Sequence, residues 1–384
     1  MPKFIEKNVK IWYSVRYRKK IMEEKMKIIT NDMEKECWDI LSIYEDKEFI
    51  KEKILEVKPK IQKTMLDKVA KEINFYIKQA EELYNASNTS IITSPLTLFY
   101  SLNNLVKATY LLKFPTKGIK ASHGLSINNI NNENIKLGEI SVHIDKYGTF
   151  NNLNELLNYD LPDNYDVFIK DLLALVPEIS SIYNLIYKEE PNVYLLRKNL
   201  DKHYEYKVVL PNNSYDETTN KKFDLLEENS VQITFGTNAL GPGCYMYKTL
   251  ATKNINNIIE MDIYGNSYLA LGIELNGKIK KIQQLSIIYI ILYTYSMEVR
   301  YKSSEWINII NSKEKAIVKK SIDVFKIKML IGILSLLEND KYEFINKIDD
   351  YKEDVNYSKV TDEVLKEIKM RNRRYGKSVL GELV

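Results

Sequence analysis

The sequence predicts an α+β protein in which mainly helical N- and C-terminal segments pack together around an inserted β-rich middle, with an antiparallel or mixed sheet. Apolar residues recur at three- and four-residue steps in both outer segments, which predicts helices there. Between them, short β-branched or aromatic runs are bounded by Gly, Pro, Asn or Asp and predict strands. A hydrophobic fraction of 45% beside 28% charged residues is typical of a folded chain.

These changes of pattern divide the 384 residues into four segments. Residues 1–70 are predicted to be an N-terminal helical extension, and 71–125 the first part of a helical core. Residues 126–278 form the β-rich middle with one helical insertion, and 279–384 the second part of the core with a basic C-terminal end. The length allows two or three lobes, and equally one interrupted domain.

The N-terminal arm is helical from about residue 17 to residue 85, with a break at Pro59. Apolar residues between 66 and 77 fall on one face of a long helix. After a polar gap, Ser94 as N-cap and Pro95 in the first turn open a second helix.

The middle alternates strand patterns with turns, and one helical insertion is predicted at 168–187. From residue 281 the chain is expected to be helical nearly to its end. The uncharged run 282–297 is shorter than the roughly 20 residues that cross a bilayer, and it contains glutamines and tyrosines, so it predicts a buried helix. The predicted strands are 137–144, 192–196, 204–210, 231–235, 245–250 and 268–273.

Charge and cysteine content bear on whether the protein binds nucleic acid, contains disulfides or binds zinc. A net charge of +4 does not by itself imply nucleic-acid binding, although lysines and arginines cluster at 3–20 and 369–377. These clusters are either solvated faces or phosphate-contacting surfaces. Cys37 and Cys244 are far apart without metal-type spacing, which favours neither a disulfide framework nor a zinc site. We expect a cytoplasmic protein with no cofactor, no metal and no membrane contact.

Four stretches taken in order resemble the YaaC-like family of bacterial proteins. They are the helix at 94–108, Ser122-His123-Gly124-Leu125, the segment 172–179, and 296–302 followed by Trp306. The resemblance extends over about residues 73–342. It implies an architecture and supplies little chemistry.

His123 and Arg300 are the predicted catalytic residues. His123 precedes Gly124 at the junction of the first arm and the β-rich middle, where it acts as a general base or phosphate ligand, or else fixes the junction through backbone carbonyls. Arg300 ends an apolar helix and is suited to a bidentate grip on phosphate or carboxylate, or else to an ion pair with Glu298 or Glu305. If the two arms pack together, His123 and Arg300 meet in one composite site.

Four further residues of the same segments are predicted to bind substrate: Asn104, Lys107, Tyr301 and Trp306. The first functional hypothesis is a metal-independent RNA- or nucleotide-directed effector in bacterial stress or antiphage defence. The comparison is with HEPN-type ribonucleases, which use an arginine and a histidine. The alternative is a non-enzymatic scaffold or binding protein with a protein partner or a second copy of itself, because tyrosine and phenylalanine are abundant.

Three other motifs are weaker evidence for a catalytic or phosphate-binding site. Arg197 and His203 have the HEPN spacing of four to six residues but fall between predicted paired strands, so a hairpin turn is favoured. Glu205-x-Lys207 resembles the end of a restriction-type nuclease motif without its aspartate. The glycine-rich run at 236–243 lacks the Gly-Lys-Ser/Thr of a phosphate loop, which favours a turn.

Overall fold

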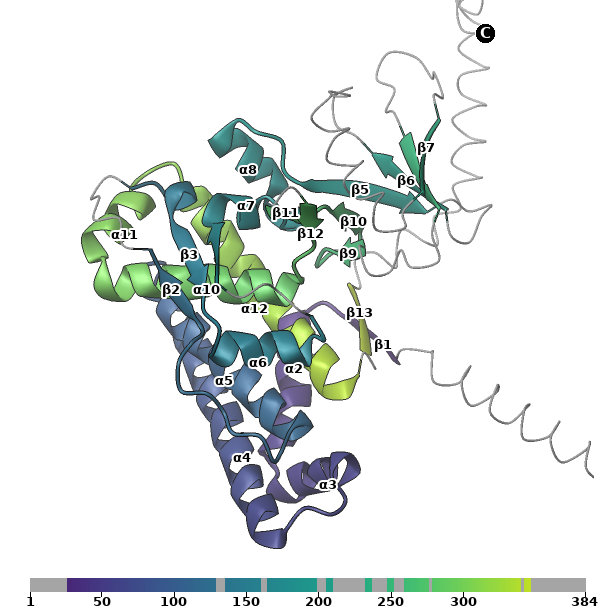
Figure 1. The fold of residues 1–384 in the computed structure, drawn as a ribbon, viewed down its shortest axis with the longest axis vertical. Coiled ribbons are helices and arrows are strands. Elements are labelled where there is room, and N and C mark those ends of the chain that lie inside the picture. The colour runs from purple at the N-terminus through teal and green to yellow at the C-terminus, as the bar shows by residue number, and fades with distance from the viewer. Residues whose placement is uncertain are drawn as a thin grey trace, which may run out of the picture.

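The structure is a computed structural model that describes residues 26–128, 135–159, 164–198, 205–209, 232–236, 247–251, 259–275, 278–339 and 342–346. The two basic clusters, Cys244, His203 and residues 237–243 lie outside the described residues. Figure 1 shows a helical body from which the longer strands extend to one side.

The N-terminal arm is helical as predicted. Asp32 and Asp46 cap the first two helices by accepting hydrogen bonds from the backbone amides of Lys35 and Phe49. Pro59 lies in the break before the third helix, which is the long amphipathic one. The helices are α2 (Met33–Ser42), α3 (Lys47–Val57), α4 (Lys63–Ala86) and α5 (Ser94–Lys113).

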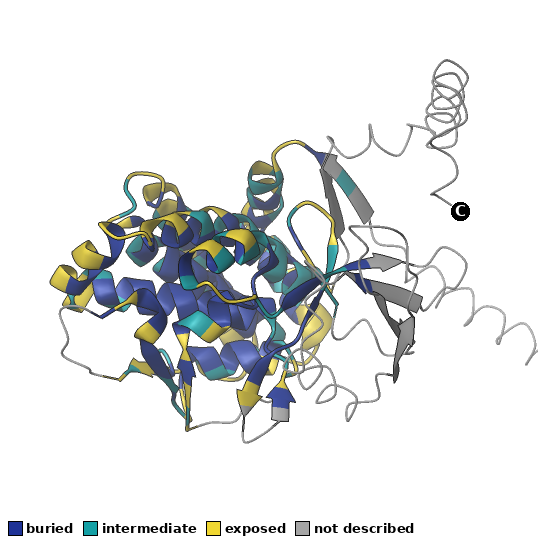
Figure 2. Ribbon diagram, turned by 90° about the horizontal axis from the view of Figure 1, so that it is seen from above, coloured by how far each residue is buried: buried dark blue, intermediate teal, exposed yellow. Residues whose placement is uncertain are grey.

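The C-terminal arm packs directly against it. Helix α5 contacts α4, α10 and α12, and α5 and α10 are buried along almost their whole length (Figure 2). Tyr289 of α10 donates a hydrogen bond to Asn103 of α5 inside this contact, at 2.8 Å. In the described part of the chain, no helix is long and apolar enough to cross a membrane. The helices are α10 (Gln284–Tyr301), α11 (Ser303–Ile310) and α12 (Lys315–Glu338).

The middle contains separate antiparallel sheets. One has three strands in the order β2-β3-β4, and another has six in the order β7-β8-β6-β5-β10-β9, while β11 and β12 form a hairpin. The strands are β2 (Leu125–Ile127), β3 (Ser141–Ile144), β4 (Tyr165–Phe168), β5 (Val193–Lys198), β6 (Glu205–Val209), β7 (Gln232–Gly236), β8 (Tyr247–Ala251), β9 (Ile259–Met261), β10 (Ser267–Ala270), β11 (Ile273–Leu275) and β12 (Lys278–Lys280).

Several local predictions were wrong. β1 (Met26–Thr30) and β13 (Tyr342–Asn346) are strands in segments expected to be helical, and they pair in parallel. The insertion at 168–187 is two helices, α7 (Ile169–Leu173) and α8 (Ser180–Tyr187), joined through a 3₁₀ turn, because Pro177 interrupts it. Helix α6 (Thr149–Leu156) was not predicted. The N-cap of α5 is Thr93, so Ser94 is already inside the helix.

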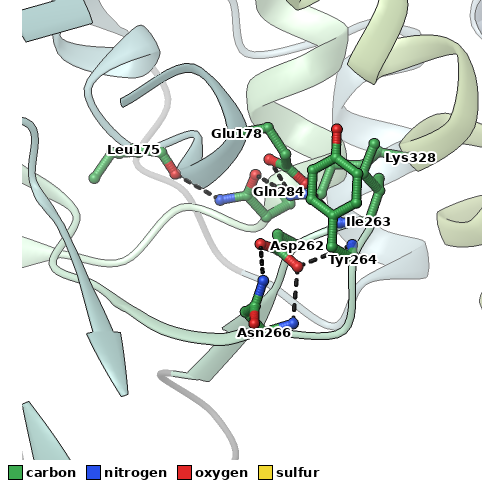
Figure 3. A network of polar contacts seen from close by, with 8 residues as sticks. All are labelled: Leu175, Glu178, Asp262, Ile263, Tyr264, Asn266, Gln284 and Lys328. Atoms are coloured by element: carbon green, nitrogen blue, oxygen red, sulfur yellow. Dashed lines mark hydrogen bonds and ion pairs between the residues drawn. The ribbon is translucent and has the colours of Figure 1, made fainter. Parts of the chain in front are cut away.

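A buried polar network joins the six-stranded sheet to the helical body (Figure 3). Asp262 shapes the turn between β9 and β10 by accepting hydrogen bonds from the backbone amides of Tyr264 and Asn266. Glu178 accepts a hydrogen bond from the backbone amide of Ile263 at 2.9 Å and pairs with Lys328 of α12 at 3.0 Å. The turn is therefore held against α12 by a buried charge pair.

Candidate functional site

His123 lies on a loop that α6 holds in place. The backbone amides at the start of α6 donate hydrogen bonds to the loop: Thr149 to the Ser122 carbonyl and Phe150 to the His123 carbonyl, both at 2.9 Å. Gly124 has φ +78°, and a Cβ atom on Gly148 would stand 2.0 Å from the Gly124 nitrogen. Two glycines therefore let the two backbones meet and fix where the His123 ring points.

Three aromatic rings surround the His123 imidazole. Its centroid lies 5.2 Å from that of Phe99, 6.0 Å from Tyr100 and 5.7 Å from Tyr293. Nδ1 is buried and has no hydrogen-bond partner among the described residues. A buried N–H without a partner costs more than a lone pair facing ring edges, so the neutral ring keeps its proton on Nε2. Nε2 is then the atom that can donate to a ligand.

Arg300 reaches the same place from the end of α10. Its Nη1 donates a hydrogen bond to the hydroxyl of Tyr100 at 2.8 Å, while its guanidinium lies 4.8 Å from the centre of the Tyr301 ring. Among the described residues, Arg300 forms no ion pair with Glu298 or Glu305. Glu298 instead lies 3.8 Å from the ammonium group of Lys302. Tyr100 thus lies between Arg300 and the His123 ring, so these two residues lie close together, and their catalytic role stays a prediction.

Lys107 and Asn104 extend this site along α5. With Thr97 and Tyr100 they follow a spacing of three, four and three residues, which places them on one face of the helix. Lys107 lies 5.6 Å from the centre of the Tyr76 ring. Asn104 is buried and donates a hydrogen bond to Gln79 at 2.8 Å, so its amide already has a partner on α4.

The electrostatics of the site favour a bound anion. Burial lowers the pKa of His123 below its usual value, and the nearby charges of Lys107 and Arg300 lower it further. Burial also lowers the pKa of Lys107. Lys107 and Arg300 therefore disfavour a positive charge on His123, and a negatively charged ligand placed among these side chains relieves that repulsion.

The two remaining predicted site residues, Tyr301 and Trp306, lie in different environments. Tyr301 is 66% exposed and lies beside Arg300, whereas Trp306 is 1% exposed and packs on Tyr295 in the core. Trp306 therefore cannot touch a ligand at this surface. Sequence reasoning missed Phe99, Tyr100 and Tyr293, although the polar spacing along α5 was a usable signal for Tyr100.

The competing motifs do not form sites in the described residues. Arg197 lies on β5, which pairs with β6 as predicted, and His203 lies outside the described residues. Glu205 and Lys207 lie on β6 in the same sheet. Within the described ranges, no group of three or more His, Cys, Asp or Glu side chains could hold a metal ion.

A comparison with protein-family models gives one match. The model described as "YaaC-like Protein" covers residues 40–337, which includes most of both helical arms and every residue of the site above. Neither the curated proteins nor the solved structures contain a match.

Proposed function

The chain belongs to the YaaC-like family, and from the site that its two arms build we propose that it is an RNA-directed protein that holds a backbone phosphate between Arg300, Lys107 and His123. The observation that carries the proposal is the convergence of two cations on a histidine whose buried face leaves only Nε2 available. Three neighbouring donors, two of them cationic, suit a phosphate group.

RNA is favoured over a small nucleotide because of the exposed aromatic ring at the site. Tyr301 offers its face beside the guanidinium of Arg300, and base stacking on such rings is a general mode of single-strand binding. A nucleotide would use the same phosphate donors without needing an open surface. Single-stranded RNA uses both features.

Cleavage without a metal is the stronger form of the proposal. In it the 2′-oxygen of the RNA attacks the adjacent phosphorus, the bond to the 5′-oxygen breaks, and a 2′,3′-cyclic phosphate and a 5′-hydroxyl result. A water molecule accepts the 2′-hydroxyl proton, while Arg300, Lys107 and the Nε2–H of His123 stabilise the charge on the phosphate oxygens, and a proton from water passes to the 5′-oxygen. A role in bacterial stress or antiphage defence is proposed on the same basis.

Binding is tested with a fluorescently labelled single-stranded RNA of about ten nucleotides, followed by anisotropy at several salt concentrations. Arg300→Gln should weaken binding about tenfold, because a charge-assisted hydrogen bond contributes about 1.5–3 kcal/mol. Lys107→Gln should also reduce the slope of log K against log salt concentration by about one, because one fewer counterion is released on binding. Lys71→Gln on the exposed part of α4 is the matched control. Unchanged binding in both site variants would sink the proposal.

Cleavage is tested with total RNA in the presence of EDTA. Wild type should produce fragments ending in cyclic phosphate, and His123→Ala should lose this activity while keeping its fold by circular dichroism. His143→Ala is the control. That histidine lies on β3, and its Nδ1 forms a hydrogen bond with Oδ1 of Asp166 at 2.6 Å. Equal cleavage by wild type and His123→Ala rejects the catalytic form, and binding without any cleavage leaves recognition as the function.

The non-enzymatic alternative is favoured by one observation. Tyr301, the last residue of α10, and Ile307 on α11 are both large, exposed side chains, at 66% and 47%. A protein partner or a second copy of the chain would cover them. Failure of RNA to bind, together with a dimer in sedimentation that Ile307→Ser disrupts, would favour this function instead.

A further inference from the structure

A pocket separate from the His123 site lies where the loop before α5 meets α12. It has a volume of about 340 Å³ and shares no residue with the His123 site. This is at the small end of the range for ligand pockets. Its wall comes from the loop 87–91 and the first residue of α5 on one side and from α12 on the other; the residues are Ser87, Asn88, Thr89, Ser90, Ile91, Ser94, Lys315, Lys319, Ile322, Asp323 and Lys326.

The charges at this pocket are mainly positive. Lys315, Lys319 and Lys326 line it against the single carboxylate of Asp323. Lys326 donates a hydrogen bond to the Asn88 side chain at 2.5 Å. The side-chain ammonium groups of Lys315 and Lys319 have no hydrogen-bond or ion-pair partner among the described residues, so both are free to meet an anion.

Ser94 gives a second, independent observation that points to a ligand in this pocket. It lines the pocket, is only 3% exposed, and its Oγ is buried without a hydrogen-bond partner among the described residues. A buried hydroxyl without a partner is costly, and native proteins rarely keep one without a reason. Because Thr93 is the N-cap, this hydroxyl does not cap α5 either.

We propose that this pocket binds the phosphate group of a small phosphomonoester, with Lys315 and Lys319 neutralising its charge and Ser94 Oγ donating to one of its oxygens. The ligand's uncharged part lies against Ile91 and Ile322, the apolar residues of the wall. A volume of about 340 Å³ suits a small molecule rather than a strand of RNA.

The test uses the full chain carrying Arg300→Gln, so that a failure here is distinguishable from a failure at the His123 site. Calorimetric titration with inorganic phosphate and with glycerol 3-phosphate should show one binding event, tighter for the phosphomonoester. Lys319→Gln and Ser94→Ala should each weaken it about tenfold. Lys320→Gln, one residue further along α12 and outside the pocket wall, should leave it unchanged.

A footprint on the unmutated chain locates the ligand without relying on the variants' stability. Glycerol 3-phosphate should slow acetylation of Lys315 and Lys319 severalfold and leave Lys320 unaffected, as read by mass spectrometry. No binding of either probe, or equal losses with Lys319→Gln and Lys320→Gln, would overturn the proposal. Equal protection of all three lysines would overturn it as well, because it would indicate a general effect of the anion.

Discussion

Glu298 is fully buried on α10, and neither of its carboxylate oxygens accepts a hydrogen bond from the described residues. Burial raises the pKa of this carboxyl to about 7, and the nearby charge of Glu305 adds to the rise, while Lys302 at 3.8 Å opposes it. The carboxyl therefore binds a proton at a pH where an exposed glutamate would have lost it.

This position makes the stability of the protein depend on pH. Between the unfolded pKa of 4.5 and the folded pKa of about 7, the native state holds more protons than the unfolded state, so the free energy of unfolding falls as the pH rises. The loss amounts to about 3 kcal/mol. When the free energy of unfolding in urea is measured from pH 4.5 to 8, Glu298→Gln should remove this fall with rising pH. Glu82→Gln, at an exposed position, should keep it. A slope unchanged in Glu298→Gln would contradict the assignment.

The glycine pair under His123 supports a second prediction. Gly148→Ala places a methyl group 2.0 Å from the Gly124 nitrogen and 2.6 Å from the His123 carbonyl carbon, so the loop must move. We expect a loss of about 3 kcal/mol in the free energy of unfolding and a changed NMR chemical shift of the His123 ring. Gly118→Ala, whose Cβ would meet nothing within 4 Å, is the control and should lose less than about 0.5 kcal/mol.

At the scale of elements, the contact between the β9–β10 turn and α12 rests on one buried charge pair (Figure 3). Lys328→Ala would leave Glu178 buried with only the Ile263 amide and no opposite charge, which costs about 3–5 kcal/mol. Hydrogen exchange at residues 259–275 should accelerate in this variant before the helices open. Lys320→Ala on the same helix is the control, and equal exchange in both variants would show that the pair does not hold the turn.

At the scale of the whole molecule, the middle of the chain separates two halves of one core. α5 comes before it and α10 and α12 follow it, yet these three helices pack on one another. A fragment ending at residue 275 leaves the buried face of α5 exposed. It should bind the dye ANS and lack a cooperative thermal transition, whereas co-expression with residues 279–384 should restore one. A cooperative transition in the fragment alone would mean that the first half folds independently.

The helices of this core could be predicted because their apolar residues repeat at helical spacing, which depends only on local sequence. The strands β1 and β13 could not, because each is defined by a partner more than 300 residues away. Ser94 shows the limit at a single residue: its type fits an N-cap, but the chain enters the helix at Thr93, and this register depends on the turn before it.

The sequence by itself determined the class of fold, the identity of the two arms and the choice of His123 and Arg300, since each follows from periodicity or from residue chemistry. Tertiary structure alone decided that these two residues lie close together, that Tyr100 joins them, and that Trp306 is buried in the core. The physical reason is that proximity across the core is set by how α5 packs on α10, and the sequence of neither helix contains that relation.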